Sequence, residues 1–148
     1  MRRNKDAEYM KLALRLAARG EGKTSPNPAV GAVVVRNGEI IGRGYHKKAG
    51  RPHAEIEAFS DAEKRGKNLK GATLYVTLEP CCHEGKRTPP CVNAIIEKGI
   101  TDVFVAAPDP NPKVSGKGIA SLKRAGVNIS TGLLENEAKK LNRPFFKF

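Results

Sequence analysis

Long apolar runs are missing from this 148-residue sequence. A membrane-spanning helix needs about 20 consecutive apolar residues, so no such helix is expected. Charges interrupt residues 1–20 every few positions, which excludes the apolar core of a signal peptide. Asp6 and Glu8 argue against a transit peptide, because such peptides are poor in acidic residues. The sequence therefore predicts a cytoplasmic protein without a membrane partner.

Cysteine is scarce, and its distribution is uneven. The chain has three cysteines, all within residues 81–91. An odd number in a reducing compartment is a poor basis for a disulfide framework. The cluster instead indicates a local chemical role.

A block of like charges is also absent, although the net charge is +12. A basic surface suits nucleic acid, a phosphorylated ligand or plain solvation, and the charge alone does not choose among them. The composition, with 39% hydrophobic and 28% charged residues, is typical of a globular protein. At this length we expect one domain over residues 1–148.

Hydrophobic periodicity and turn residues predict alternating helices and strands. Asp6 is expected to cap the first helix, and Asn37-Gly38 predicts a tight hairpin between the first two strands. Helices are predicted from 6 to about 20 and at 54–65, 92–98, 119–125 and 135–141, and strands at 30–35, 39–45, 72–78, 102–107 and 127–131. Single helices between the later strands imply right-handed crossovers and parallel pairing. The fold predicted is an α/β three-layer α/β/α sandwich with a mixed five-stranded sheet.

Four residues suggest a catalytic metal site. His53 opens a helix, Cys81 follows a strand, and Cys91 begins the next helix. Loops at the carboxyl ends of neighbouring strands meet at one sheet edge, and a catalytic zinc takes three protein ligands plus one open position. Glu55 would face the metal without binding it and serve as the proton shuttle. His-x-Glu followed by Pro-Cys matches the zinc deaminase signature, except that Glu84 stands where its second cysteine is expected.

Longer motifs extend this match over nearly the whole chain. They are PNPAVGAVVV (26–35), GYH (44–46), HAE (53–55), GATLYVTLEPCCHEGKRTPPC (71–91), DPNPKVSGKG (109–118) and LNRPFF (141–146). With them the chain resembles the diaminohydroxyphosphoribosylaminopyrimidine deaminases of riboflavin biosynthesis, which have a cytidine deaminase-like fold. The resemblance implies hydrolysis of the 2-amino group of 2,5-diamino-6-(5-phosphoribosylamino)pyrimidin-4(3H)-one, with release of ammonia.

The same resemblance implies residue roles. One Zn²⁺ per chain is held by His53, Cys81 and Cys91, and Glu55 is catalytic. The substrate is held by further residues, with Lys86 or Arg87 at its phosphate: Asn27, His46, Ala54, His83, Lys86, Arg87, Asp109 and Asn111. Asn27, Asp109 and Asn111 each precede a proline, so the alternative is that they only stabilise turns and do not contact substrate. A homo-oligomer is also expected.

Two features depart from the family pattern. The loop between the cysteines is one residue longer than usual, so Cys82 would restore the familiar spacing; Cys81 is favoured because Pro80 places it directly after the strand. Relatives commonly continue into an NADPH-dependent reductase domain, which is expected to be separate or lost here. SGKGIAS (115–121) is not a dinucleotide motif, because Ser121 replaces the last glycine and no strand precedes it.

Two alternatives remain open. A tRNA or nucleoside deaminase of the same superfamily would suit the basic charge, but the DPNP motif and the cysteine spacing argue against a nucleic-acid partner. A non-catalytic zinc-binding or RNA-binding module would want a fourth protein ligand, which only Cys82 or His83 could supply. The presence of Glu55 favours catalysis.

Overall fold

A single twisted sheet organises the computed structural model, which describes residues 2–24, 27–81, 91–112 and 115–145. The strands are β1 (Gly31–Arg36), β2 (Glu39–Tyr45), β3 (Thr73–Leu78), β4 (Asp102–Ala107) and β5 (Asn128–Thr131). Their order across the sheet is β2-β1-β3-β4-β5. β1 is antiparallel to both β2 and β3, whereas β3, β4 and β5 run parallel. The predicted mixed five-stranded sheet is confirmed.

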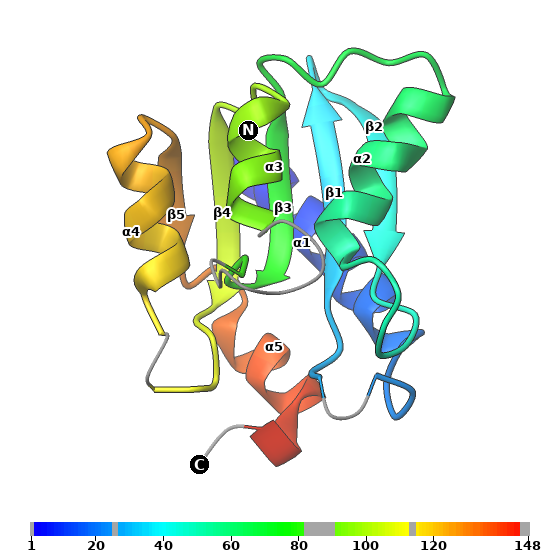
Figure 1. Ribbon diagram of the computed structural model, residues 1–148, viewed down its shortest axis with the longest axis vertical. Helices are drawn as coiled ribbons and strands as arrows, with labels where there is room; N and C mark the ends of the chain where they lie inside the picture. Colours follow the sequence, from blue (N-terminus) through cyan, green and yellow to red (C-terminus); the bar gives the residue numbers. More distant parts are fainter. Residues whose placement is uncertain (1, 25–26, 82–90, 113–114, 146–148) are drawn as a thin grey trace.

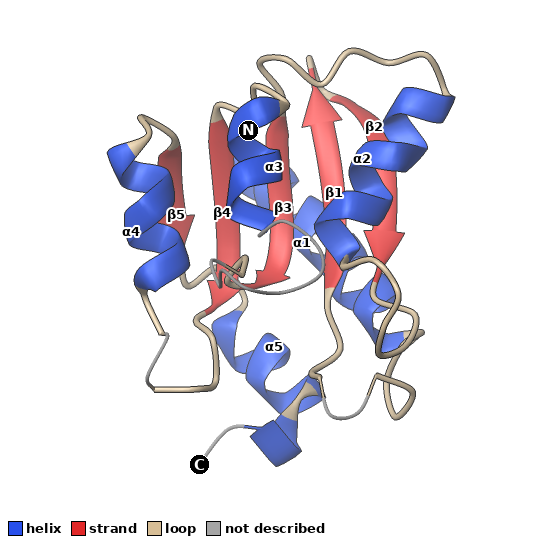
Figure 2. Ribbon diagram, in the orientation of Figure 1, coloured by secondary structure: helices blue, strands red, loops and turns tan. Residues whose placement is uncertain are grey.

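Helices cover both faces of this sheet (Figures 1 and 2). The helices α2 (Ala54–Lys64), α3 (Cys91–Glu97) and α4 (Lys117–Arg124) lie on one face. The helices α1 (Arg2–Ala18) and α5 (Glu135–Leu141) lie on the other, and a short 3-10 turn, η1 (Arg143–Phe145), follows α5. Each face has its own apolar core, one centred on Phe59 and Leu74 and the other on Met10 and Val33. The three-layer sandwich is therefore confirmed.

Local turn chemistry behaves as expected at the hairpin. Asn37 and Gly38 have φ values of 52° and 77°, so both occupy the left-handed region that a type I′ turn requires. Predicted and observed boundaries of the later elements differ by at most two residues, as at the start of α4. Helix ends commonly vary by this much.

The predicted helix cap at Asp6 is wrong. The helix α1 begins at Arg2, so Asp6 lies inside it. Its carboxylate accepts a hydrogen bond from the hydroxyl of Tyr75 on β3. A tertiary partner 69 positions away, rather than the helix terminus, satisfies this side chain.

Close backbone packing joins α1 to the sheet. A Cβ atom on Gly31 would overlap the carbonyl oxygen of Ala13 and come within 2.7 Å of the Ala17 amide nitrogen. Glycine at the start of β1 thus lets α1 lie directly on the strand.

Across the described ranges, no helix is both long and apolar enough to cross a bilayer.

The strand directions gather several chain segments at one edge of the sheet. The parallel strands β3 and β4 end together, with Leu78 paired to Ala107. Since β1 is antiparallel to β3 and β2, its beginning lies at this edge with the end of β2, where Gly31 is paired to Tyr45. Residues 27–30, 46–55, 79–81 and 108–111 therefore meet there.

Candidate active site

Three potential metal ligands converge at this edge. His53 immediately precedes α2, Cys81 lies three residues after β3, and Cys91 is the first residue of α3. The Nδ1 atom of His53 lies 3.2 Å from the Sγ of Cys91 and 3.6 Å from the Sγ of Cys81. All three ligand atoms fall within 4.8 Å of one another.

These separations fit zinc. Tetrahedral bonds of about 2.0 Å to nitrogen and about 2.3 Å to sulfur place neighbouring ligand atoms roughly 3.5 Å apart. Imidazole and thiolate are also the donors that zinc prefers. Within the described residues the cluster has three members, as a catalytic site with one open position requires. Cys82, the alternative ligand, lies outside the described residues.

Without a metal, the two thiols of this cluster are tuned in opposite directions. Hydrogen bonds from the side chains of Cys91 and His53 outweigh burial and lower the pKa of Cys81 to about 4. The hydrogen bond to Cys81, together with burial, raises the pKa of Cys91. The backbone N–H of Cys91 also donates to the Sγ of Cys81 at 3.3 Å. Cys81 is thus stabilised as the thiolate that metal binding requires.

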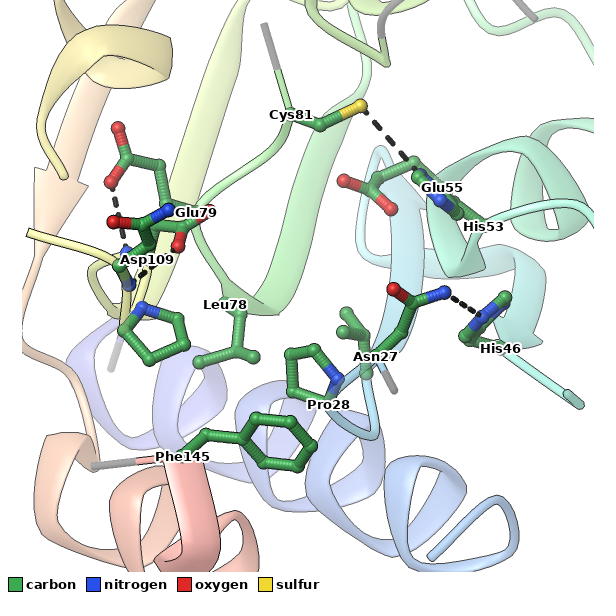
Figure 3. Close-up of a pocket in the computed structure, with 13 residues that line it drawn as sticks. Asn27, Pro28, His46, His53, Glu55, Leu78, Glu79, Cys81, Asp109 and Phe145 are labelled. Carbon is green, nitrogen blue, oxygen red and sulfur yellow. Dashed lines mark hydrogen bonds between the residues drawn. The ribbon is translucent and has the colours of Figure 1, made fainter. Parts of the chain in front are cut away.

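Glu55 lies beside the cluster, in the first turn of α2. The residue is only 3% exposed, and its carboxyl group lines a pocket of about 310 Å³ that His53 and Cys81 share (Figure 3). Burial raises the pKa of this carboxyl group to about 7. Near neutral pH, such a group both accepts and donates a proton readily.

His46 and Asn27 form the adjacent wall of the pocket. Burial lowers the pKa of His46, and its Nδ1 lies 3.2 Å from the carbonyl oxygen of Pro52. A neutral ring protonated at Nδ1 donates to that carbonyl and leaves Nε2 to accept. The side-chain nitrogen of Asn27 lies 3.5 Å from this Nε2 and can donate to it (Figure 3). This contact orients the Asn27 amide, so that its oxygen is available to accept a hydrogen bond from a ligand in the pocket.

Glu79 fixes the opposite wall. Its Oε1 accepts the backbone N–H groups of Asp109 at 3.0 Å and Gly116 at 2.9 Å, and its Oε2 accepts that of Ile119 at 3.1 Å. Asp109 in turn accepts the backbone N–H of Asn111 at 2.8 Å. The hydrogen bond between Asp109 and Asn111 is the turn contact considered above as the alternative to substrate binding. Both residues nevertheless line the pocket.

The structure therefore brings together most of the residues expected at the site. Asn27, His46, His53, Glu55, Cys81, Asp109 and Asn111 line the pocket, and Cys91 completes the metal cluster. Ala54 is fully buried at the start of α2 and is not among the lining residues of the described chain. His83, Lys86 and Arg87 lie outside the described residues.

Several pocket residues were not expected from the sequence. They are Pro28, Val30, Leu78, Glu79, Pro110 and Phe145. Glu79 could have been noticed as a charged residue between an apolar strand and Pro80. Phe145 belongs to the LNRPFF motif, to which no role was assigned. Its spacing from the metal ligands offered no signal that it reaches the pocket.

Comparisons with known proteins agree with this geometry. Residues 3–107 match the family described as the cytidine and deoxycytidylate deaminase zinc-binding region. The chain is 57% identical, over its whole length, to the riboflavin biosynthesis protein RibD of Aquifex aeolicus and spans 40% of that protein. It is 52% identical to the diaminohydroxyphosphoribosylamino-pyrimidine deaminase of Buchnera aphidicola subsp. Schizaphis graminum, covering 97% of this chain and 95% of that protein.

A solved structure supports the same relationship. The bifunctional diaminohydroxyphosphoribosylaminopyrimidine deaminase and 5-amino-6-(5-phosphoribosylamino)uracil reductase of Thermotoga maritima superposes with a TM-score of 0.92 at 48% identity. The match covers 98% of this chain and 41% of that one. The fold, the three-ligand cluster and the buried glutamate thus coincide with a family match over most of the chain. The chain belongs to the cytidine and deoxycytidylate deaminase zinc-binding family and, within it, to the diaminohydroxyphosphoribosylaminopyrimidine deaminases.

Proposed function

We propose that this chain deaminates 2,5-diamino-6-(5-phosphoribosylamino)pyrimidin-4(3H)-one to 5-amino-6-(5-phosphoribosylamino)uracil in riboflavin biosynthesis. The observation that carries the proposal is the shared pocket, which places Glu55 beside the His53, Cys81 and Cys91 cluster. The Buchnera relative named for this substrate has nearly the same length as the matched region. Its name supports the substrate, and the site supports the reaction type.

The proposed reaction is a hydrolysis at the carbon that bears the 2-amino group. The water oxygen becomes the new carbonyl oxygen, one of its protons goes to the ring nitrogen, and the other goes to the departing amine. The C–N bond breaks and ammonia leaves. Glu55, with a pKa raised to about 7 by burial, is suited to carry these protons in both directions.

The metal ligands contribute the second part of the chemistry. His53, Cys81 and Cys91 would hold a zinc ion, which supplies Lewis-acid activation of water at neutral pH. The partly buried cluster would keep the two sulfur atoms and the imidazole in place before the substrate arrives, so little reorganisation would accompany binding.

The polar walls of the pocket would hold the substrate over Glu55. Asn27 and His46 lie on one side, and Asp109 and Asn111 lie on the other. Amide, imidazole and carboxylate groups complement the alternating donors and acceptors of an aminopyrimidinone. Such positioning groups orient the reacting carbon and so lower the entropic part of the barrier.

Ammonia release tests this proposal directly. The zinc-loaded chain is incubated with the phosphoribosylaminopyrimidine and, separately, with cytidine, deoxycytidylate and tRNA. We expect ammonia from the phosphoribosylaminopyrimidine with kcat/KM at least a hundredfold above the other three. Faster release from cytidine or deoxycytidylate would assign the site to a nucleoside or nucleotide instead. Release from none of the four would support a non-catalytic zinc-binding protein.

A further inference from the structure

The segment after α5 makes an unusual long-range contact with the pocket wall. The side-chain oxygen of Asn142 accepts the backbone N–H of Ala29 at 2.7 Å, and its side-chain nitrogen donates to the carbonyl oxygen of Ala29 at 2.8 Å. One amide thus satisfies both backbone groups of a residue 113 positions away. We name this pair of bonds the Asn142 clasp.

The clasp acts on a segment that lines the site. Ala29 is buried, and its neighbours Asn27, Pro28 and Val30 all line the pocket. Asn142 is itself only 3% exposed, so water cannot readily replace either bond. The position of Asn27 beside His46 therefore depends on a contact made by the C-terminal part of the chain.

The same segment delivers an aromatic ring. The backbone N–H of Phe145 donates to the carbonyl oxygen of Asn142 at 2.9 Å, which closes the 3-10 turn η1. This turn carries Phe145 to the pocket, where its ring lies near Pro28 and Leu78 (Figure 3). In the same view it lies at the end away from Cys81 and Glu55. The pocket thus has a reactive end and an apolar end.

The family match covers only part of the pocket lining. The matched residues 3–107 include the metal cluster and Glu55. Asp109, Pro110, Asn111 and Phe145 follow the match and supply the remaining pocket wall. The metal cluster and Glu55 thus lie within the family match, whereas the pocket is completed partly by residues that follow it.

We infer that Phe145 is a substrate-contacting residue that takes an apolar or π face of the substrate, and that Asn142 is the positioning residue that holds both Phe145 and Asn27 in place. The substrate role rests on the proposed function. A contact far from the reacting carbon that is equally strong before and during the reaction changes KM and leaves kcat nearly unchanged. Phe145 adds an aromatic surface at the apolar end of the pocket, whereas the metal cluster and Glu55 at the other end supply the reaction.

Steady-state kinetics on the zinc-loaded protein tests the role of Phe145. Loss of stacking on one aromatic ring weakens binding by about tenfold, so Phe145→Ala is expected to raise KM about tenfold. We expect kcat within about threefold of wild type, unchanged zinc content and an intermediate KM for Phe145→Leu. Pro144→Ala, an exposed residue of the same turn, is the matched control and should keep the wild-type KM. A KM for Phe145→Ala within twofold of wild type would overturn the role of Phe145.

Hydrogen exchange tests the clasp without any substrate. Asn142→Asp replaces the donor to the Ala29 carbonyl with an acceptor, and Asn142→Ala removes both bonds. We expect exchange of the Ala29 amide to accelerate at least tenfold in Asn142→Ala, to accelerate less in Asn142→Asp, whose carboxyl oxygen can still accept that N–H, and to stay unchanged in Pro144→Ala. Unchanged exchange in both Asn142 variants would refute the clasp. Should the wild type release no ammonia from the pyrimidine, the proposed function fails while this measurement still decides the clasp.

Discussion

Removing the carboxylate of Glu79 should loosen one wall of the pocket and destabilise the fold around it. Three backbone N–H groups donate to this carboxylate, and the residue is 7% exposed. A hydrogen bond to a charged group contributes about 1.5–3 kcal/mol. Asp109 and Gly116 lie in the segment before α4 and Ile119 lies in its first turn; none of the three is fully buried, so water can replace some of these bonds. We therefore expect Glu79→Ala to cost about 3–5 kcal/mol in total, less than three full bonds.

Thermal unfolding of the zinc-loaded protein measures this cost. At this chain length, 1 kcal/mol corresponds to about 2–4 °C in Tm, so Glu79→Ala should lower Tm by about 6–20 °C. Glu79→Gln keeps one accepting oxygen and should fall between the alanine variant and the wild type. Loss of order at Asp109 and Asn111 should also raise KM for the pyrimidine in both variants.

A surface glutamate provides the matched control. Glu63 makes an ion pair with Lys98 at 2.7 Å, but its side chain is 50% exposed. Such pairs contribute about 0–1 kcal/mol, so Glu63→Gln should lower Tm by no more than about 4 °C. If Glu79→Ala unfolds within about 2 °C of the wild type, the three backbone contacts do not stabilise the loop and the reasoning is wrong.

Substitutions at Glu55, at the two adjacent cysteines and at two glycines test the site and the fold. Glu55→Gln should keep one zinc per chain by metal analysis while kcat falls about 10²–10⁴-fold, and near-wild-type turnover would contradict its proton-transfer role. Cys81→Ser should lose zinc while Cys82→Ser keeps it, and the reverse result would move the ligand to Cys82. Gly31→Ala should lower the midpoint of urea unfolding, because its Cβ overlaps the Ala13 carbonyl. Gly50→Ala, where a Cβ meets nothing within 4 Å, should cost only about 1–2 kcal/mol for its positive φ, and an equal loss in both variants would refute the packing argument.

Short-range features of this protein follow from its sequence alone. The Asn37-Gly38 turn needs two residues with positive φ, and few other dipeptides supply them. His53 and Glu55 are two positions apart at a helix start, so their proximity is set by local geometry. The pairing of these residues with Cys81 and Cys91 required one further rule, that parallel strands end at the same edge. These features rest on local propensity and a general rule of topology.

Only the tertiary structure decided which distant partner several polar side chains meet, including two that help to form the pocket. Asp6 meets Tyr75 across 69 positions, Glu79 holds the loop before α4, and Asn142 pairs with Ala29 across 113 positions. Each of these side chains could equally cap a helix, form a turn or face solvent, so residue type and spacing do not identify its partner. The partner is fixed by the strand order β2-β1-β3-β4-β5 and by α5 packing on the face opposite α2, since burial there leaves backbone N–H and C=O groups that a polar side chain must satisfy.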